Sequence, residues 1–252
     1  PDAKLKRTFL QATRYWEEHT CIKFSEAEQL DKHYVKIMQR NQCGARVGRM
    51  RFRSGQIFIF NERCSIGTVV HELGHVMGLF HEQQRYDRDD HIILNTKNLK
   101  ASCGTVSCIP NFLQQSKYNL NTYKIPYDIG SIMHYGPKVF TDSRGLFTAR
   151  TRDPQLSGLL GQRVRLSHRD KLVVNRMYNC VDKWITRCGR DRELCLNMGY
   201  TGANCKCICS PGTTGTNCQN IIGNYYDNVI PKCNREVRTP QVIWASSRDK
   251  HR

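Results

Sequence analysis

The sequence lacks several features that mark particular classes of protein. It contains no run of 18 or more apolar residues, which excludes a membrane-spanning helix. It has no Gly-x-Ser-x-Gly element of the serine hydrolases and no Asn-x-Ser/Thr site for N-glycosylation. Its first residues do not include the apolar segment of a signal peptide, so a secreted protein with this sequence would be a mature form or a fragment.

Acidic residues are scarce. There are 22 Asp and Glu residues against 39 Lys and Arg residues, and the formal net charge is +17. Such a charge is compatible with nucleic acids, heparin-like polymers or an anionic matrix as partners. The basic residues are spread along the chain and no nucleic-acid-binding motif is present, so we expect no specific nucleic-acid partner.

Cysteine, in contrast, is abundant. The 13 cysteines in 252 residues indicate a disulfide framework and therefore a secreted, extracellular protein. Six of them lie between residues 188 and 218, in a stretch rich in Gly, Asn and Thr that cannot build an apolar core. We therefore predict a larger domain over residues 1–183, a small disulfide-held module over 184–222, and a basic tail over 223–252.

Hydrophobic periodicity gives a coarse view of the secondary structure. It predicts helices over 5–18, 65–79 and 167–178, and strands over 21–24, 34–38 and 56–60. Ser167, followed three residues later by Asp170, resembles a capping box at the start of the last helix. This mixture favours the α+β class.

A single short segment carries the candidate metal chemistry. His71 and His75 are four residues apart, so on a helix they share one face and can bind one zinc ion. Glu72 lies on the adjoining face, close to a metal-bound water. Gly78 can end the helix, which allows His81 to approach the same metal. Three histidine ligands leave a position for water, as in a catalytic rather than a structural zinc site.

A second motif identifies the family that the sequence resembles. Residues 131–136 read Ser-Ile-Met-His-Tyr-Gly, Glu82 directly follows the third histidine, and residues 85–89 read Arg-Tyr-Asp-Arg-Asp. Together with the histidine motif, these features closely resemble the astacin family of metalloendopeptidases, a metzincin group. The resemblance covers about residues 5–180. It implies a two-lobed α+β zinc protease domain in which Met133 is the structural methionine under the metal.

The same resemblance implies a role for each matching site residue. His71, His75 and His81 would bind one catalytic zinc ion. Glu72 would be the general base that takes a proton from the metal-bound water. Tyr135 would ligate zinc at rest and swing away to stabilise the tetrahedral intermediate.

The implied function is that of a secreted zinc-dependent endopeptidase acting on extracellular matrix, cuticle or other extracellular proteins. An extended polypeptide substrate would pair along residues 55–60 as an edge strand. The net charge makes acidic peptides plausible substrates. The alternative function is a non-proteolytic extracellular adhesion or polyanion-binding protein that uses the small module and the basic surface.

The resemblance also implies a pairing of the cysteines. The small module resembles an EGF-like module of the kind that follows the protease in many astacins, particularly those of nematodes. Six cysteines allow 15 pairings, so the order within the module follows from resemblance alone. The implied pairs are Cys21–Cys180, Cys43–Cys64, Cys188–Cys205, Cys195–Cys207 and Cys209–Cys218, with Cys103–Cys108 as a local loop without a counterpart in the simplest astacins and Cys233 left unpaired.

The start of the domain differs from the family pattern. Astacins usually carry about two dozen mature residues ahead of the first helix, including a first strand and an N-terminus buried near the position of Glu82. Here the sequence begins almost at the helix over 5–18. We therefore expect a catalytic domain without that first strand.

Overall fold

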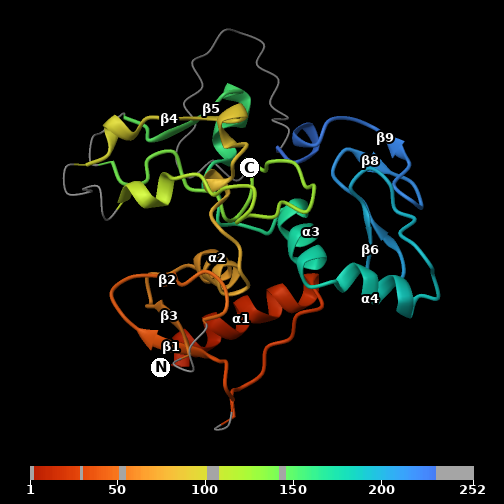
Figure 1. Cartoon of the computed structure of the whole chain (residues 1–252), viewed down its shortest axis with the longest axis horizontal. Helices are drawn as coiled ribbons and strands as arrows, with labels where there is room; N and C mark the ends of the chain where they lie inside the picture. Colours follow the sequence, from red (N-terminus) through yellow and green to blue (C-terminus); the bar gives the residue numbers. More distant parts are fainter. Residues whose placement is uncertain (1–2, 29–30, 51–54, 101–107, 142–145, 231–252) are drawn as a thin grey trace, which may run out of the picture.

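The computed structural model describes residues 3–28, 31–50, 55–100, 108–141 and 146–230. Figure 1 shows helices α1 and α2 beside a small sheet at one end of the molecule and short irregular elements around β4 and β5 at the other. A group of very short strands, β6 to β9, lies to the side and is reached through helix α4.

Helices and strands both occur along most of the described chain. The α-helices are α1 (Ala3–His19), α2 (Ile66–Val76), α3 (His168–Met177) and α4 (Cys180–Arg187). The strands are β1 (Val35–Gln39), β2 (Gly44–Ala45), β3 (Gln56–Phe60), β4 (Ile92–Leu94), β5 (Ala149–Thr151), β6 (Tyr200–Thr201), β7 (Cys207–Ile208), β8 (Thr213–Thr214) and β9 (Asn220–Ile221). Single-turn 3₁₀ helices fill much of the rest, including η1 (Glu82–Gln84), η6 (Ile109–Phe112) and η8 (Tyr226–Asn228). This content agrees with the predicted α+β class.

All three predicted helices are confirmed, and their ends have clear physical causes. The Ser65 hydroxyl accepts the Thr68 N–H and caps α2. The capping box of Ser167 and Asp170 is formed at the start of α3. Beyond the end of α2, Gly78 has a φ of +103°, a backbone conformation that residues with a side chain rarely adopt.

The prediction of a strand over 21–24 is wrong. A strand needs a neighbour that accepts and donates backbone hydrogen bonds, and this segment pairs with no strand in the described part of the chain. Its amides have other partners instead. The Cys21 N–H points at Cys180 Sγ, 3.2 Å away, and the Phe24 N–H donates to Glu17 Oε1 at 2.8 Å.

The prediction that residues 55–60 form an edge strand is also wrong. The strand β3 is formed, but it lies in the middle of its sheet, in the order β1-β3-β2. It pairs in parallel with β1 along its length and antiparallel with β2 through Phe58 and Ile59. Since β1 covers one side of β3 along its length and β2 covers Phe58 and Ile59 on the other, β3 is not the edge strand of this sheet. The outer strand on the other side of β3 is β2, which is too short to leave a strand pattern in the sequence.

The core of the first part of the chain lies between α1, α2 and the sheet. Trp16 of α1 is fully buried, and its indole N–H donates to the Val70 carbonyl of α2 at 3.0 Å. The rings of Phe9, Phe58 and Phe60 pack edge-on or tilted at 5.3–6.1 Å. Burial of these large rings fixes α2 against the sheet, which sets the position of the histidines that α2 carries.

The side module is joined to the rest of the chain by a helix rather than by a flexible linker. The predicted boundary near residues 182–184 falls within α4. Trp184 and Ile185 of α4 are buried in one cluster with Leu172 of α3 and Tyr200 of β6. Residues 223–230, predicted as the start of a tail, also belong to the folded structure and reach back to the residues before the second motif.

Disulfide bonds connect segments that are distant in sequence. The structure forms Cys21–Cys180, Cys43–Cys64, Cys188–Cys205, Cys195–Cys207 and Cys209–Cys218, the same five pairs that the resemblance implies. Cys108 is also disulfide-bonded, whereas Cys103 and Cys233 lie outside the described residues. Within the described ranges, no helix is long and apolar enough to cross a lipid bilayer.

Cys21–Cys180 and Cys43–Cys64 differ in the length of chain that they close. We expect the double variant Cys21→Ala/Cys180→Ala to lose more stability than Cys43→Ala/Cys64→Ala, because the sequence separations are 159 and 21. The loop-closure relation gives a difference of about 1.8 kcal/mol. Denaturant unfolding of both variants in non-reducing buffer measures it, and equal losses would contradict the expectation.

Candidate active site

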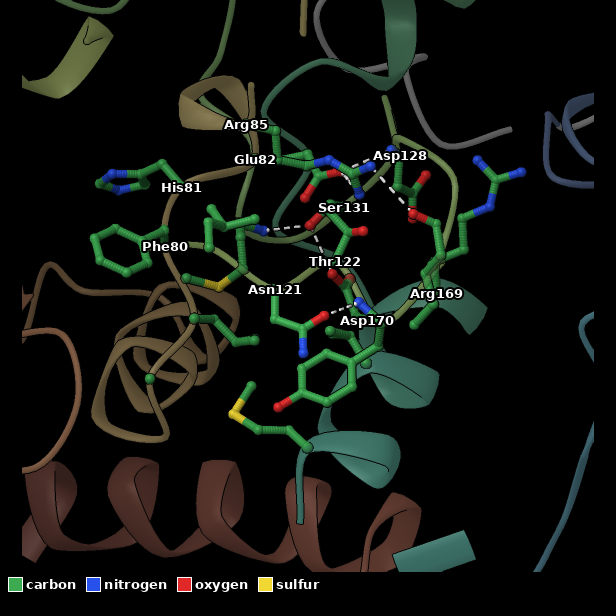
Figure 2. A pocket seen from close by; sticks show the side chains of 18 of the residues that line it. Phe80, His81, Glu82, Arg85, Asn121, Thr122, Asp128, Ser131, Arg169 and Asp170 are labelled. Carbon is green, nitrogen blue, oxygen red and sulfur yellow. Dashed lines mark hydrogen bonds and ion pairs between the residues drawn. The ribbon is translucent and has the colours of Figure 1, made fainter. Parts of the chain in front are cut away.

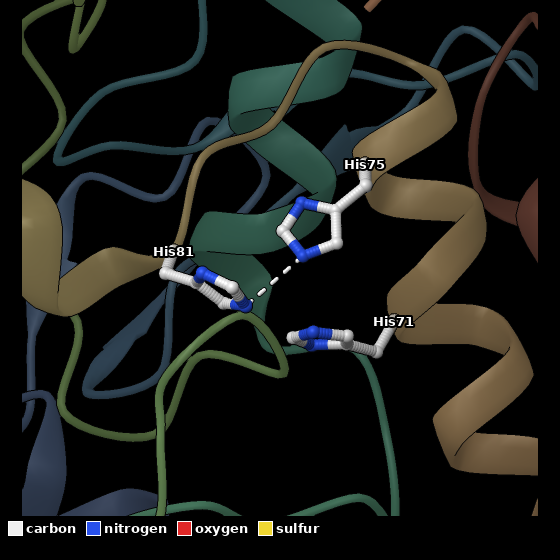
Figure 3. Close-up of side chains that lie close together, drawn as sticks. All are labelled: His71, His75 and His81. Carbon is white, nitrogen blue, oxygen red and sulfur yellow. Dashed lines mark hydrogen bonds between the residues drawn. The ribbon is translucent and has the colours of Figure 1, made fainter. Parts of the chain in front are cut away.

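Three histidine side chains converge at the end of α2. His71 and His75 lie one turn apart on its buried face, and both are 4% exposed. The turn at Gly78 redirects the chain so that His81 points back toward them (Figure 3). One nitrogen from each ring lies within 4.8 Å of the others, and Nε2 of His75 is 3.0 Å from Nε2 of His81.

The outer nitrogens of two of these rings are held by backbone carbonyls. Nδ1 of His71 is 2.7 Å from the Ile132 oxygen, and Nδ1 of His75 is 2.7 Å from the Leu79 oxygen. A carbonyl only accepts, so each Nδ1 carries the proton and each Nε2 presents a lone pair. Burial lowers the pKa of all three histidines, that of His75 to about 4, so the rings are neutral at physiological pH.

Neutral imidazole nitrogens that lie this close together can bind one cation between them. Nitrogen donors of this kind, each oriented by a hydrogen bond from its other ring nitrogen, are what zinc sites in proteins use. The donor set formed by His71, His75 and His81 therefore fits one zinc ion.

Glu72 lies beside this cluster without belonging to it. Its side chain is on the face of α2 that adjoins the histidine face, and the residue is 7% exposed. Burial raises the pKa of Glu72 to about 7, while the Ala45 N–H and Arg163 act in the opposite direction. A carboxyl group with a pKa near neutrality can both take up and release a proton at physiological pH.

Met133 lies directly under the histidine helix. It is 2% exposed, and a Cβ atom on Gly74 would come within 2.6 Å of its sulfur. Any side chain at position 74 would therefore require the Met133 side chain to move. The backbone of this loop also contacts the segment after the helix, because the Met133 carbonyl accepts the Glu82 N–H at 3.1 Å.

Tyr135 packs against the third histidine. Its ring centroid is 4.2 Å from that of His81, and its hydroxyl donates to Asn111 Oδ1 at 3.3 Å. Burial raises the pKa of Tyr135 to about 12, so the hydroxyl keeps its proton at neutral pH. The resemblance implies zinc ligation by this tyrosine, and in this structure its hydroxyl is bonded to Asn111.

Two residues outside the second motif hold it in place. Asp170, identified from the sequence only as a helix cap, accepts the Ile132 N–H at 2.9 Å and the Ser131 hydroxyl at 2.6 Å. Arg163 was not identified. Its guanidinium donates to the His134 carbonyl at 3.0 Å, and its charge acts on Glu72, on Tyr135 and on the histidines. No pattern in the sequence links a lone arginine so far downstream to the histidine motif.

A cavity of about 240 Å³ lies behind the third histidine (Figure 2). Glu82 borders it and pairs with Arg85, whose guanidinium also binds Asp87. Burial raises the pKa of Glu82 to about 8, with Arg85 opposing that shift. Across the cavity lie Asp128 and Arg169, and Asp128 Oδ2 is buried without a hydrogen-bond partner among the described residues.

Comparison with known proteins agrees with this site. The family model described as Astacin (Peptidase family M12A) matches residues 2–179. Blastula protease 10 of Paracentrotus lividus is 37% identical over 217 residues, which are 84% of this chain and 35% of that protein. Zinc metalloproteinase nas-36 of Brugia malayi is 33% identical over 213 residues, 83% of this chain and 34% of that protein. The chain thus spans about a third of the length of these curated relatives.

A solved structure shares the fold. High choriolytic enzyme 1, a hatching enzyme zinc-protease from Oryzias latipes, superposes with a TM-score of 0.63 at 28% identity, covering 71% of this chain and 84% of that one. A family match over most of the chain, relatives above 30% identity and a common fold lead to one conclusion. The chain belongs to the astacin family, peptidase family M12A.

Proposed function

We propose that this chain is a zinc-dependent endopeptidase. The observation that carries the proposal is the convergence of three neutral imidazoles within 4.8 Å, with the buried carboxyl group of Glu72 beside them. A structural zinc site uses four protein ligands, whereas three leave a position for a reacting molecule. The solved relative is named as a zinc-protease, which supports the same reaction class for this chain.

The proposed chemistry divides between the metal and the side chains around it. Zinc bound by His71, His75 and His81 supplies a Lewis acid that polarises a carbonyl and acidifies water. Glu72 takes the proton from the attacking water and passes it to the leaving amine, for which its pKa of about 7 is suited. The Tyr135 hydroxyl, protonated at neutral pH, rotates from Asn111 and donates a hydrogen bond to the tetrahedral oxyanion of the substrate.

We propose that an extended substrate pairs with β2. On the side away from β3, this strand faces no other strand in the described structure. Ala45 places its N–H beside Glu72, and within the described residues the backbone of Val47 makes no hydrogen bond. A substrate strand added at this edge would pass directly over Glu72. The backbone groups of Val47 would form hydrogen bonds with the backbone of that strand.

We further propose that the substrate carries an acidic side chain near the scissile bond. Arg163 is close enough to Glu72 and Tyr135 to act on both electrostatically, and it forms no ion pair among the described residues. In the described part of the chain its guanidinium donates to the carbonyl oxygens of His134 and Gln162. A guanidinium without an ion-pair partner among the described residues favours a carboxylate on the substrate, in keeping with the net charge of +17.

The place of action is proposed to be extracellular, with matrix or other extracellular proteins as substrates. The five disulfides support an oxidising compartment. Three of them hold residues 188–218 together, as expected for an EGF-like module. The alternative of a non-proteolytic adhesion protein is less well supported, because adhesion has no need of a buried histidine cluster with a base and an oxyanion donor.

The assignment of the base is tested by Glu72→Gln. This variant keeps the size of the side chain but cannot take up a proton, so we expect peptide hydrolysis to fall by at least about 10²-fold while zinc stays bound. Zinc content by atomic absorption and cleavage of a peptide substrate measure the two effects. Chelator-treated wild type, with and without added zinc, is the control. Turnover close to wild type in Glu72→Gln would reject Glu72 as the base.

The acidic preference is tested by Arg163→Met. Loss of the charge should lower kcat/KM for peptides with an acidic residue beside the cleaved bond by about tenfold, the effect of one hydrogen bond between charged groups. A matched neutral peptide series is the control, because a general disturbance of the site would lower both series alike. An unchanged ratio between the two series would contradict the proposal.

A further inference from the structure

The chain returns to the protease part after the side module. Residues 223–230, here called the return segment, lie against the residues that precede the second motif. The hydroxyl of Tyr226 is the main contact. It accepts the Ile129 N–H at 2.9 Å, donates to the Tyr127 carbonyl at 3.2 Å, and lies 3.3 Å from a guanidinium nitrogen of Arg169. One side-chain atom thus satisfies backbone groups on both sides of residue 128.

Helix α3 provides the other half of this contact. The guanidinium of Arg169 lies 3.8 Å from the ring centroid of Tyr225 and 5.4 Å from that of Tyr226, which is cation–π geometry. It also donates to the Tyr127 carbonyl at 2.6 Å. Arg165 holds the end of the return segment by donating to the Val229 carbonyl at 3.2 Å. The return segment therefore fastens the Tyr127–Ile129 backbone to α3.

That backbone leads directly into the residues that orient the zinc ligands. The Ser131 N–H donates to the Asp128 carbonyl at 3.1 Å, and the next residue, Ile132, supplies the carbonyl that holds Nδ1 of His71. The Asp128 N–H donates to Glu82 Oε1 at 2.8 Å, and Glu82 directly follows His81. A shift of residues 127–129 would therefore change the position or orientation of two of the three histidines.

We propose that Tyr226 is a positioning residue for the zinc site, acting through the loop that it holds. This inference rests on the proposed function, and it assigns to the return segment the task of fixing the orientation of His71 and His81. Groups that hold metal ligands in place typically change metal affinity or activity by about 10- to 100-fold when removed. The return segment follows the disulfide-held module in the sequence, so the proposal also makes the active site dependent on a part of the chain beyond the match to the family model.

The neighbouring tyrosine offers a matched control. The Tyr225 hydroxyl is buried and has no hydrogen-bond partner among the described residues. Its removal in Tyr225→Phe breaks no hydrogen bond, whereas Tyr226→Phe removes three and keeps the ring over Arg169. Each variant lacks one hydroxyl oxygen of the wild type, and the two positions are adjacent in one segment.

The test compares wild type, Tyr225→Phe and Tyr226→Phe as full-length proteins. Zinc affinity is measured by chelator competition, the ligand field by the visible absorption of the cobalt-substituted proteins, and thermal stability alongside. We expect Tyr226→Phe to lose about tenfold in zinc affinity, with an altered cobalt spectrum and a lower kcat at temperatures well below unfolding. Tyr225→Phe should match the wild type. Arg165→Gln, which loosens the same segment from its other end, should change the same quantities in the same direction.

A purely structural role would give a different result. If Tyr226→Phe lowers only the unfolding temperature and leaves zinc affinity and the cobalt spectrum as in Tyr225→Phe, the proposal is overturned. These two readouts do not depend on catalysis. A wild type that binds zinc but cleaves no peptide would therefore refute the proposed function and still decide the role of Tyr226.

Discussion

Three uncharged imidazoles held against one another in a buried site are the constraint on which the rest of this structure depends. Two of the ring nitrogens are only 3.0 Å apart, so the fold must hold the rings firmly in place for them to bind one metal ion. It does so with backbone carbonyls, which cannot change protonation state and which fix the tautomer of each ring that they contact. Burial completes the arrangement, because it keeps the rings neutral and able to bind a cation.

The carbonyl that holds His71 comes from a loop, and much of the molecule serves to fix that loop. Asp170 binds it from the start of α3, the absence of a side chain at Gly74 lets Met133 pack beneath α2, and Tyr226 holds the residues upstream. These contacts come from segments far apart in the chain. The geometry of the site is thus a property of the whole fold, although its ligands lie within one short segment.

Features of the site that depend on neighbouring residues could be predicted from the sequence, and those that depend on distant contacts could not. The clustering of the histidines, the turn at Gly78 and the cap at Ser167 each depend on spacing within a short stretch of chain, so the sequence predicted them. The disulfides followed from the family resemblance and not from spacing alone. The edge strand was misplaced because β2, two residues long, carries no pattern, while the apolar alternation of β3 is equally compatible with an edge or a central position. Arg163 and Tyr226 act only through tertiary contacts, which no local signal reports.

We expect these three histidines, and no cysteine, to bind one zinc ion per chain. X-ray absorption at the zinc edge of the purified protein, together with its zinc content, tests this most directly. The expected result is one zinc per chain, a nitrogen and oxygen shell at about 2.0 Å, and the multiple scattering of imidazole rings. Absence of zinc after reconstitution, or a sulfur shell at about 2.3 Å, would contradict it.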